Sequence, residues 1–237
     1  MKVSLNRVII PLVLILTLSS NGSIIAASSN YGVFTSESSP YDTPYREWIA
    51  KWWTWWLGIP NSLHLTNNYS DSERCSVMQV GPVWFLPDII VDVGKINYTC
   101  NVPSGKAVLL PLTTTICEIG GEGPLTDSQL SECADNIITP VRNIDVTIDG
   151  KKVDVTRSFD KTNFFNVTFP QDPVRFWGDI IPGSYRGTAT GYFLFLHDLP
   201  RGEHDIELKV VDLLRGKEGP PPHYENLREG SFKIFVQ

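Results

Sequence analysis

The stretch that decides the fold is NIDVTIDGKKVDV, residues 143–155. Polar and apolar residues alternate on both sides of Asp149-Gly150, as they do in strands with one buried face. An Asp-Gly pair between two such runs is the strongest short-range signal of a β-hairpin, because both turn positions require a positive φ. We therefore predict a hairpin with strands at 143–148 and 151–155.

Strand patterns continue on both sides of this hairpin. They are rich in β-branched and aromatic residues and are separated by Gly and Pro. The predicted strands are residues 78–86, 89–93, 96–100, 107–112, 164–169, 191–196, 205–211 and 231–236. Many short strands joined by turns indicate two packed sheets. The predicted fold class is mainly β, an immunoglobulin-like or jelly-roll-type β-sandwich, with residues 43–237 as its single domain.

A Trp-rich helix is predicted at the N-terminal end of this domain. Thr43 suits its N-cap, Pro44 suits its first position, and Gly58 ends the helical pattern. Four of the five tryptophans share one face by their spacing, namely Trp48, Trp52, Trp55 and Trp56. We expect this face to pack on the sheet and Trp53, which lies off it, to be exposed. The alternative is that the tryptophans bind sugars or a membrane.

A second, short helix is predicted to cross between strands after the glycines at residues 120–123. Thr126 at the N-cap and Gln129 three residues later form a capping-box pattern. Apolar residues follow at helical spacing as far as Ile137, and Pro140 closes the helix.

The N-terminal residues have the pattern of a cleavable signal peptide. Two basic residues precede an apolar run, Val8–Leu18, that is too short for a helix to span a bilayer core of ~30 Å. Cleavage after Ala27 leaves residues 28–42 as a flexible leader rich in Ser, Pro and Tyr. We therefore predict a signal peptide at residues 1–27 and a secreted, extracellular or cell-envelope location. An uncleaved anchor is the alternative.

The charge balance limits the partners. The chain has 20 Lys and Arg against 26 Asp and Glu, and removal of residues 1–27 leaves 18 basic residues and a net charge of −8. Nucleic acids and anionic lipids both require a basic surface, so neither is an expected partner. Beyond residue 27 no run of 18 apolar residues occurs, and we expect no membrane span after cleavage.

Four cysteines follow the signal segment: Cys75, Cys100, Cys117 and Cys133. An even number of cysteines in an exported chain predicts disulfides. Of the three pairings we favour Cys75–Cys100 with Cys117–Cys133, because each closes a short local loop. A four-cysteine metal site is improbable because the chain has no C-x-x-C spacing. No cofactor is expected.

Further motifs are KWWxW at residues 51–55, CxxxQxGPVWFL at 75–86 and CxVPxGK at 100–106. Together they resemble a group of uncharacterised exported proteins of bacteria and archaea. The tail LPRGEHDI, residues 199–206, is similar to the closing strands of immunoglobulin-like domains. The resemblance implies one exported fold, and the group has no established activity to carry over to this chain.

The strongest candidate for ligand binding is the Pro- and Gly-rich loop at residues 170–187. It contains large aromatic residues and an arginine: Phe176, Trp177, Tyr185 and Arg186. Strand alternation cannot bury all of them, and an aromatic ring beside an arginine can stack on a sugar or anchor a protein. The alternative is that Trp177 plugs one end of the sandwich.

Other sites are weaker. His197 and His204 flank a turn rich in acidic residues, where imidazole and carboxylate would suit Zn²⁺ or Cu²⁺, although an ordinary charged turn explains them as well. Asn68, Asn97 and Asn166 stand in glycosylation sequons, about as many as chance gives. No catalytic motif is present: the sequence has no nucleophile elbow, zinc-protease pair or phosphate-binding loop.

These observations predict an exported, non-enzymatic envelope or extracellular protein that binds a glycan or a surface protein. The alternatives are a secreted hydrolase with a carboxylate or His site, and a structural cell-envelope subunit. An enzyme requires a concave pocket with clustered titratable groups of shifted pKa.

Overall fold

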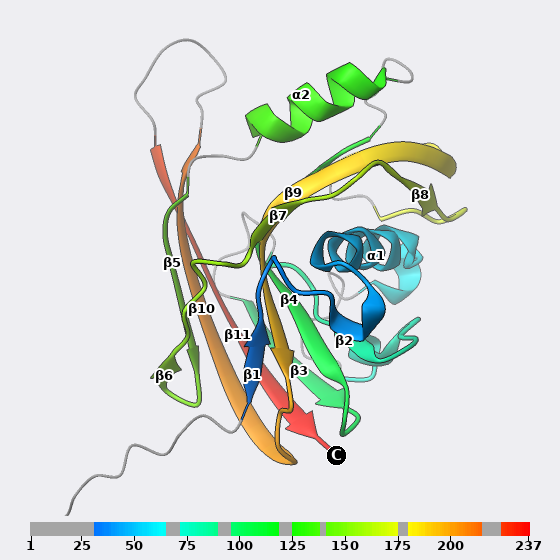
Figure 1. Ribbon diagram of the computed structural model, residues 1–237. Helices are drawn as coiled ribbons and strands as arrows, with labels where there is room; N and C mark the ends of the chain where they lie inside the picture. The colour runs from blue at the N-terminus through cyan, green and yellow to red at the C-terminus, as the bar shows by residue number, and fades with distance from the viewer. Residues whose placement is uncertain are drawn as a thin grey trace, which may run out of the picture.

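The computed structural model describes residues 31–64, 72–89, 96–118, 125–137, 141–174, 180–214 and 224–237, with the backbone alone at 137, 212–214 and 224–226. The signal segment, the first three leader residues, Asn68, Phe176 and Trp177 lie outside them. The described chain is mainly β, with two sheets in a sandwich-like arrangement and two α-helices (Figure 1).

The first sheet is built around one long strand, β9 (Gly183–His197). On one side β9 pairs antiparallel with β4 (Ala107–Cys117), which pairs in parallel with β2 (Val83–Phe85). Three short strands follow one another along the other side of β9: β8 (Phe165–Phe169), β7 (Phe159–Lys161) and β1 (Gly32–Phe34). Because β9 is so long, the sheet can bend along its length (Figure 1).

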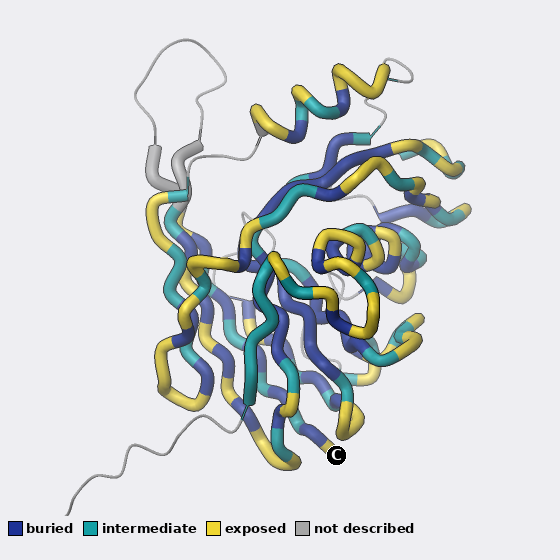
Figure 2. The backbone as a smooth tube through the Cα atoms, viewed as in Figure 1, coloured by how far each residue is buried: buried dark blue, intermediate teal, exposed yellow. Residues whose placement is uncertain are grey.

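The second sheet has the strand order β3-β11-β10-β5-β6. Its strands are β3 (Ile96–Val102), β11 (Tyr224–Val236), β10 (Gly202–Leu214), β5 (Val141–Ile148) and β6 (Lys151–Lys152). The predicted hairpin is present, with Asp149 and Gly150 at positive φ between β5 and β6. The buried faces of both sheets contribute to one hydrophobic core (Figure 2).

The Trp-rich helix is α1 (Tyr45–Gly58), and the prediction for Trp53 is wrong. The Trp53 side chain is 2% exposed, as deeply buried as the predicted stripe, and its Nε1 donates to Thr114 Oγ1 of β4 at 3.2 Å. The physical reason is that the first sheet bends around the helix, so that α1 also contacts β7, β8 and β9 (Figures 1 and 2). A helix covered on more than one side has no single buried face.

The indole N–H groups find partners at several points around α1. Trp48 donates to Pro40 O at 3.0 Å, Trp52 to Leu86 O at 2.7 Å and Trp55 to Val77 O at 2.9 Å. A buried N–H without a partner is unfavourable, so these bonds fix how each ring is seated. The start of the helix differs by one residue from the prediction, because Pro44 is the N-cap and Thr43 instead caps the C-terminal end of the preceding 3-10 helix.

The flexible leader predicted at residues 28–42 is ordered from Tyr31 onward, which corrects the prediction. Residues 32–34 form β1, and residues 40–42 form the short 3-10 helix η1 (Pro40–Asp42). The reason is pairing: β1 is hydrogen-bonded to β9, and the Phe34 ring packs edge-on against Phe195 at 5.1 Å.

The strand predicted at residues 78–86 is confined to β2, Val83–Phe85. Met78 and Gly81 have positive φ, which breaks the extended conformation. The side-chain amide of Gln79 bonds the backbone on both sides of this break. It donates to the carbonyls of Cys75 and Phe85 and accepts the Phe85 N–H at 3.0 Å.

Both favoured disulfides are present, Cys75–Cys100 and Cys117–Cys133. The first joins a short 3-10 turn (Arg74–Ser76) to β3, and the second joins the end of β4 to α2 (Asp127–Ile137). Two disulfides indicate folding in an oxidising environment outside the cytoplasm. None of the helices in the described residues is both long enough and apolar enough for a membrane crossing.

Helix α2 has the predicted capping box and packs on a small cluster of its own. Thr126 Oγ1 accepts the Gln129 N–H, while Gln129 Oε1 accepts the Thr126 N–H at 2.9 Å. Beneath the helix, Leu130 and Ala134 pack with Cys117 in a cluster separate from the main core. The helix therefore lies over the sheet as a satellite of the fold (Figure 1).

We predict that replacing both Cys117 and Cys133 by serine releases α2 while the main core stays folded. The cluster under α2 is small, so the disulfide is a large part of what holds the helix in place. Hydrogen exchange should show lost protection in α2 and unchanged protection in β10 and β11. Equal loss of protection throughout the protein would contradict this prediction.

Candidate functional site

Tyr185 and Arg186 are engaged in contacts within the chain. The Tyr185 hydroxyl donates to Ile181 O at 2.7 Å, and its ring packs on Phe169 at 5.7 Å. Arg186 lies in β9 and donates to both carboxylate oxygens of Asp127 in α2, at 2.7 and 3.0 Å, which lowers the pKa of Asp127. Its guanidinium also lies over the Phe164 ring. These contacts link α2 to β9, and Arg186 stays exposed while it makes them.

The two histidines proposed as metal ligands have separate partners. His197 Nδ1 bonds Asp198 at 2.8 Å, and its ring stacks on Phe34 at 4.3 Å. His204 Nδ1 bonds Asp149 at 2.8 Å and its Nε2 bonds Pro200 O at 2.9 Å. Within the described residues no cluster of three or more His, Cys, Asp or Glu is placed to hold a metal ion.

The His204 contacts are structural. Burial opposes a charge on the ring, but the Asp149 carboxylate and the Pro200 carbonyl prevail and raise the pKa of His204. Asp149 also accepts the Asp205 N–H at 2.9 Å. The β5–β6 turn is thereby fixed against β10.

Two glycosylation sequons lie on exposed strand faces. Asn97, in β3, is exposed and accepts a hydrogen bond from Ser231 Oγ at 2.7 Å. Asn166, in β8, is exposed as well. The third sequon residue, Asn68, lies outside the described residues.

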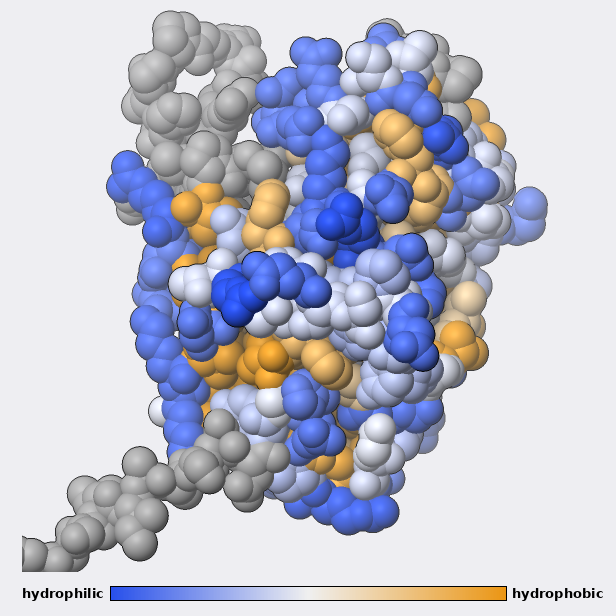
Figure 3. All heavy atoms as spheres, in the orientation of Figure 1, coloured by the Kyte–Doolittle hydropathy of each residue, from blue (hydrophilic) through white to orange (hydrophobic). Residues whose placement is uncertain are grey.

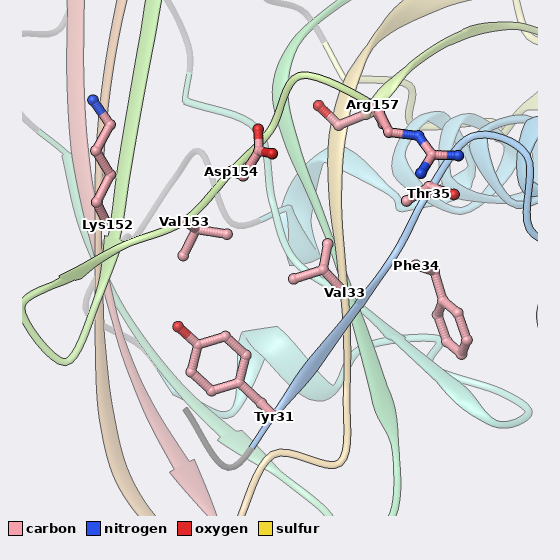
Figure 4. A pocket seen from close by; sticks show the side chains of 9 residues that line it. Tyr31, Val33, Phe34, Thr35, Lys152, Val153, Asp154 and Arg157 are labelled. Atoms are coloured by element: carbon pink, nitrogen blue, oxygen red, sulfur yellow. The ribbon is translucent and has the colours of Figure 1, made fainter. Parts of the chain in front are cut away.

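A groove forms where the two sheets separate, between β1 and residues 152–158 (Figure 4). We call it the β1 groove. Its volume is about 350 Å³. Its lining residues are Tyr31, Val33, Phe34, Thr35, Lys152, Val153, Asp154, Arg157 and Ser158. Among the described strands, β1 ends the first sheet and β6 ends the second, so the groove lies along the open side of the sandwich.

Apolar and polar groups meet in the β1 groove. Tyr31, Val33 and Val153 point toward its centre, and the Phe34 ring points away (Figure 4). The space-filling view shows hydrophobic residues in the hollow between β1 and the β5–β6 hairpin, with hydrophilic residues above them (Figure 3). Asp154 stands on the rim, where the Thr156 N–H donates to its carboxylate at 2.9 Å. That bond lowers the pKa of Asp154, which is therefore ionised at neutral pH.

The carboxyl and imidazole groups whose pKa values shift strongly lie elsewhere. Burial raises the pKa of Glu118 to about 7 and that of Asp88 to about 6, and burial lowers the pKa of His64 to about 4. Glu118 follows β4, Asp88 follows β2 and His64 follows α1, and none of them lines the β1 groove. The three strongly shifted groups therefore do not cluster in the β1 groove.

The sequence prediction missed the β1 groove because it assigned residues 28–42 to a leader. The run Tyr31-Gly32-Val33-Phe34 is aromatic and β-branched, which is the signal that could have revealed β1. Its second wall is more than 100 residues away in sequence and could not be placed beside it.

Comparisons with known proteins leave the family open. No family model matches the chain, and no curated protein matches it. Among solved structures, the chain matches the solution structure of amebosin at 12% identity, over 60% of this chain and 96% of that chain, with a TM-score of 0.17. A TM-score this low carries no argument about fold or function. The resemblance to exported bacterial and archaeal proteins stays a prediction.

Proposed function

We propose that this protein is an exported, non-enzymatic binding protein of the cell envelope or extracellular space, and that the β1 groove takes a glycan. The observation that carries the proposal is the lining of the groove. A sugar has apolar C–H faces and hydroxyl donors; Tyr31, Val33 and Val153 offer apolar surface, and the Asp154 carboxylate offers acceptors. The signal peptide predicted from the sequence and the two disulfide bonds support export.

The distribution of titratable groups supports binding over the hydrolase alternative. Hydrolysis by carboxylates or histidine needs two such groups facing one substrate, with pKa values suited to proton transfer. Burial moves the pKa values of Glu118 and Asp88 toward neutrality and that of His64 away from it, and the three residues belong to separate parts of the fold. In the β1 groove the Asp154 pKa moves the other way.

The proposal also covers the kind of β-sandwich. We infer an immunoglobulin-like sandwich in preference to a jelly roll. Support comes from the closing hairpin of β10 and β11, which pair along their whole length, and from β3, which joins β11 in parallel at the edge of the sheet. Immunoglobulin-like domains commonly act as binding modules through exposed ends and edges.

A surface protein is the second candidate ligand. One observation favours it: among the described strands, β1 ends its sheet beside the groove, and end strands can accept a strand from a partner. Such a partner would contact the β1 backbone, whereas a glycan would depend chiefly on the Tyr31 side chain.

A glycan array probed with the mature protein tests the proposal. We expect binding to a restricted set of glycans, reduced at least roughly ten-fold in affinity by Tyr31→Ala, because central aromatic side chains dominate binding energy. Tyr41→Ala is the matched control: Tyr41 is 47% exposed and lies outside the groove lining. Glycan binding that is insensitive to Tyr31→Ala would contradict the assignment to the groove, and capture of a surface protein without glycan binding would favour the second candidate.

A further inference from the structure

The two disulfides lie in different surroundings. Cys75 and Cys100 are completely buried and belong to the main hydrophobic core. Cys117, at the end of β4, is 3% exposed, whereas its partner Cys133 in α2 is only partly buried. A molecule in solution can therefore approach the second disulfide from the Cys133 side. It can reach the first disulfide only when the core opens, which costs far more free energy than a local movement.

Apart from the disulfide, a small apolar cluster and two ion pairs attach α2 to the first sheet. The cluster lies beneath the helix and includes Cys117 itself. Arg186 of β9 pairs with Asp127 at the start of α2, and Lys161 of β7 pairs with Asp135 near its end at 2.6 Å. Both ion pairs are largely exposed, so water weakens them. The disulfide is therefore the strongest single attachment of α2.

From these contrasts we propose that the Cys117–Cys133 disulfide is the site at which a dithiol reductant acts on this protein. Its reduction detaches α2 from the first sheet while both sheets stay folded. The helix lies over that sheet and contacts β4 and β9, so detachment uncovers the ends of these two strands (Figure 1). The Cys75–Cys100 disulfide stays intact under the same conditions. This inference does not depend on a ligand in the β1 groove.

The reaction is a thiol–disulfide exchange in two steps. One thiolate of the dithiol attacks the Cys133 sulfur, the bond between the two cysteine sulfurs breaks, and Cys117 leaves as a thiolate that takes up a proton. The second thiolate of the dithiol then attacks the mixed disulfide and releases Cys133, which takes up a proton in turn. The dithiol is oxidised to its own disulfide, and two electrons and two protons pass to the protein.

The test uses the folded mature protein with both disulfides formed, and dithiothreitol as the dithiol. Free thiols are alkylated at timed intervals and located by peptide mapping. We expect Cys117 and Cys133 to be alkylated together, at least roughly ten-fold faster than Cys75 and Cys100, because the latter pair reacts only after the core opens. Hydrogen exchange on the same samples should show lost protection in α2, regained on reoxidation, and constant protection in β10 and β11.

Two variants show whether the attachment of α2 controls the reaction. The Cys117 sulfur leaves from beneath the helix, so α2 must move as the bond breaks. Leu130→Ala removes a buried side chain of the cluster under α2, and should speed reduction of this disulfide at least roughly three-fold while the rate for the other disulfide stays constant. Ser128→Ala is the matched control: Ser128 is exposed on α2, and its replacement should change neither rate.

Three results would overturn the inference. Reduction of both disulfides at one rate would show that the protein opens as a whole before either reacts. Faster reduction of Cys75–Cys100 would show that burial does not protect it. Selective reduction of Cys117–Cys133 with full protection left in α2 would show that the apolar cluster and the ion pairs hold the helix without the disulfide.

Discussion

Replacing Trp53 by alanine should destabilise the protein by about 3–5 kcal/mol, as much as Trp52→Ala does. Trp53 is 2% exposed, contacts the Trp52 ring edge-on at 5.0 Å, and donates its indole N–H to Thr114 Oγ1. Truncation removes the packing of a large ring and leaves a cavity between α1 and β4. Because a domain is stable by only about 5–15 kcal/mol, the variant should melt many degrees lower or fail to be secreted.

Denaturant unfolding of the two variants side by side measures this effect. Thr54→Ala is the matched control, because Thr54 is exposed and its hydroxyl bonds only Ala50 O within the helix. Its stability should stay within about 0.5 kcal/mol of the wild type. A Trp53→Ala variant as stable as this control would show that Trp53 is exposed after all.

The error on Trp53 shows where helical periodicity stops being informative. Spacing identifies the residues that share one face, and it placed Trp48, Trp52, Trp55 and Trp56 on a buried face, as the structure has them. Spacing does not report a second covering surface. That surface exists because β9 is long enough to pair with β8 beyond the reach of β4, and β8 then lies against the helix. Only the long-range strand pairing contains this information.

Features formed by residues close together in the sequence could be predicted. The Asp149-Gly150 turn, the Thr126–Gln129 capping box and both disulfides each connect residues that are near in sequence, so the residue types alone indicated them. The candidate site was not local. Arg186 is occupied by Asp127 from 59 residues away, and the β1 groove joins residues 31–35 to residues 152–158. No pattern within a single window could reveal either pairing.

The burial of His64 against α1 should make the stability of the protein depend on pH. Its side chain is fully buried after α1, with the ring 4.1 Å from the Trp56 ring and Nε2 at 3.2 Å from Trp56 O. Arg74 donates to the His64 carbonyl at 3.0 Å and adds positive charge nearby. Burial and, less strongly, Arg74 disfavour the protonated ring, and the pKa of His64 falls to about 4 although the Trp56 carbonyl opposes the shift.

Acidification from pH 7 to pH 4.5 should therefore remove stability through His64. The pKa of an unfolded histidine is near 6.5, so below this pH the unfolded chain binds a proton that the folded protein does not. The contribution is present above about pH 6.5 and is lost as the pH falls toward 4, by on the order of 3 kcal/mol at the full pKa difference. His64→Gln, which can still donate to Trp56 O, should lack this loss. Denaturant midpoints of both proteins across the pH range measure the difference.

The variant must be compared with the wild type, because two carboxyl groups change the stability with pH in the direction opposite to His64. Glu118 and Asp88 have pKa values raised in the folded state, so each stabilises the fold at low pH and loses that contribution as the pH rises toward about 7 and about 6. The wild-type profile is thus flatter than His64 alone would make it. Glu118→Gln should become more stable at pH 7 relative to pH 4.5, whereas His64→Gln should become relatively more stable at pH 4.5. Two variants that shift the profile in the same direction would show that the folded protein favours the protonated form of His64.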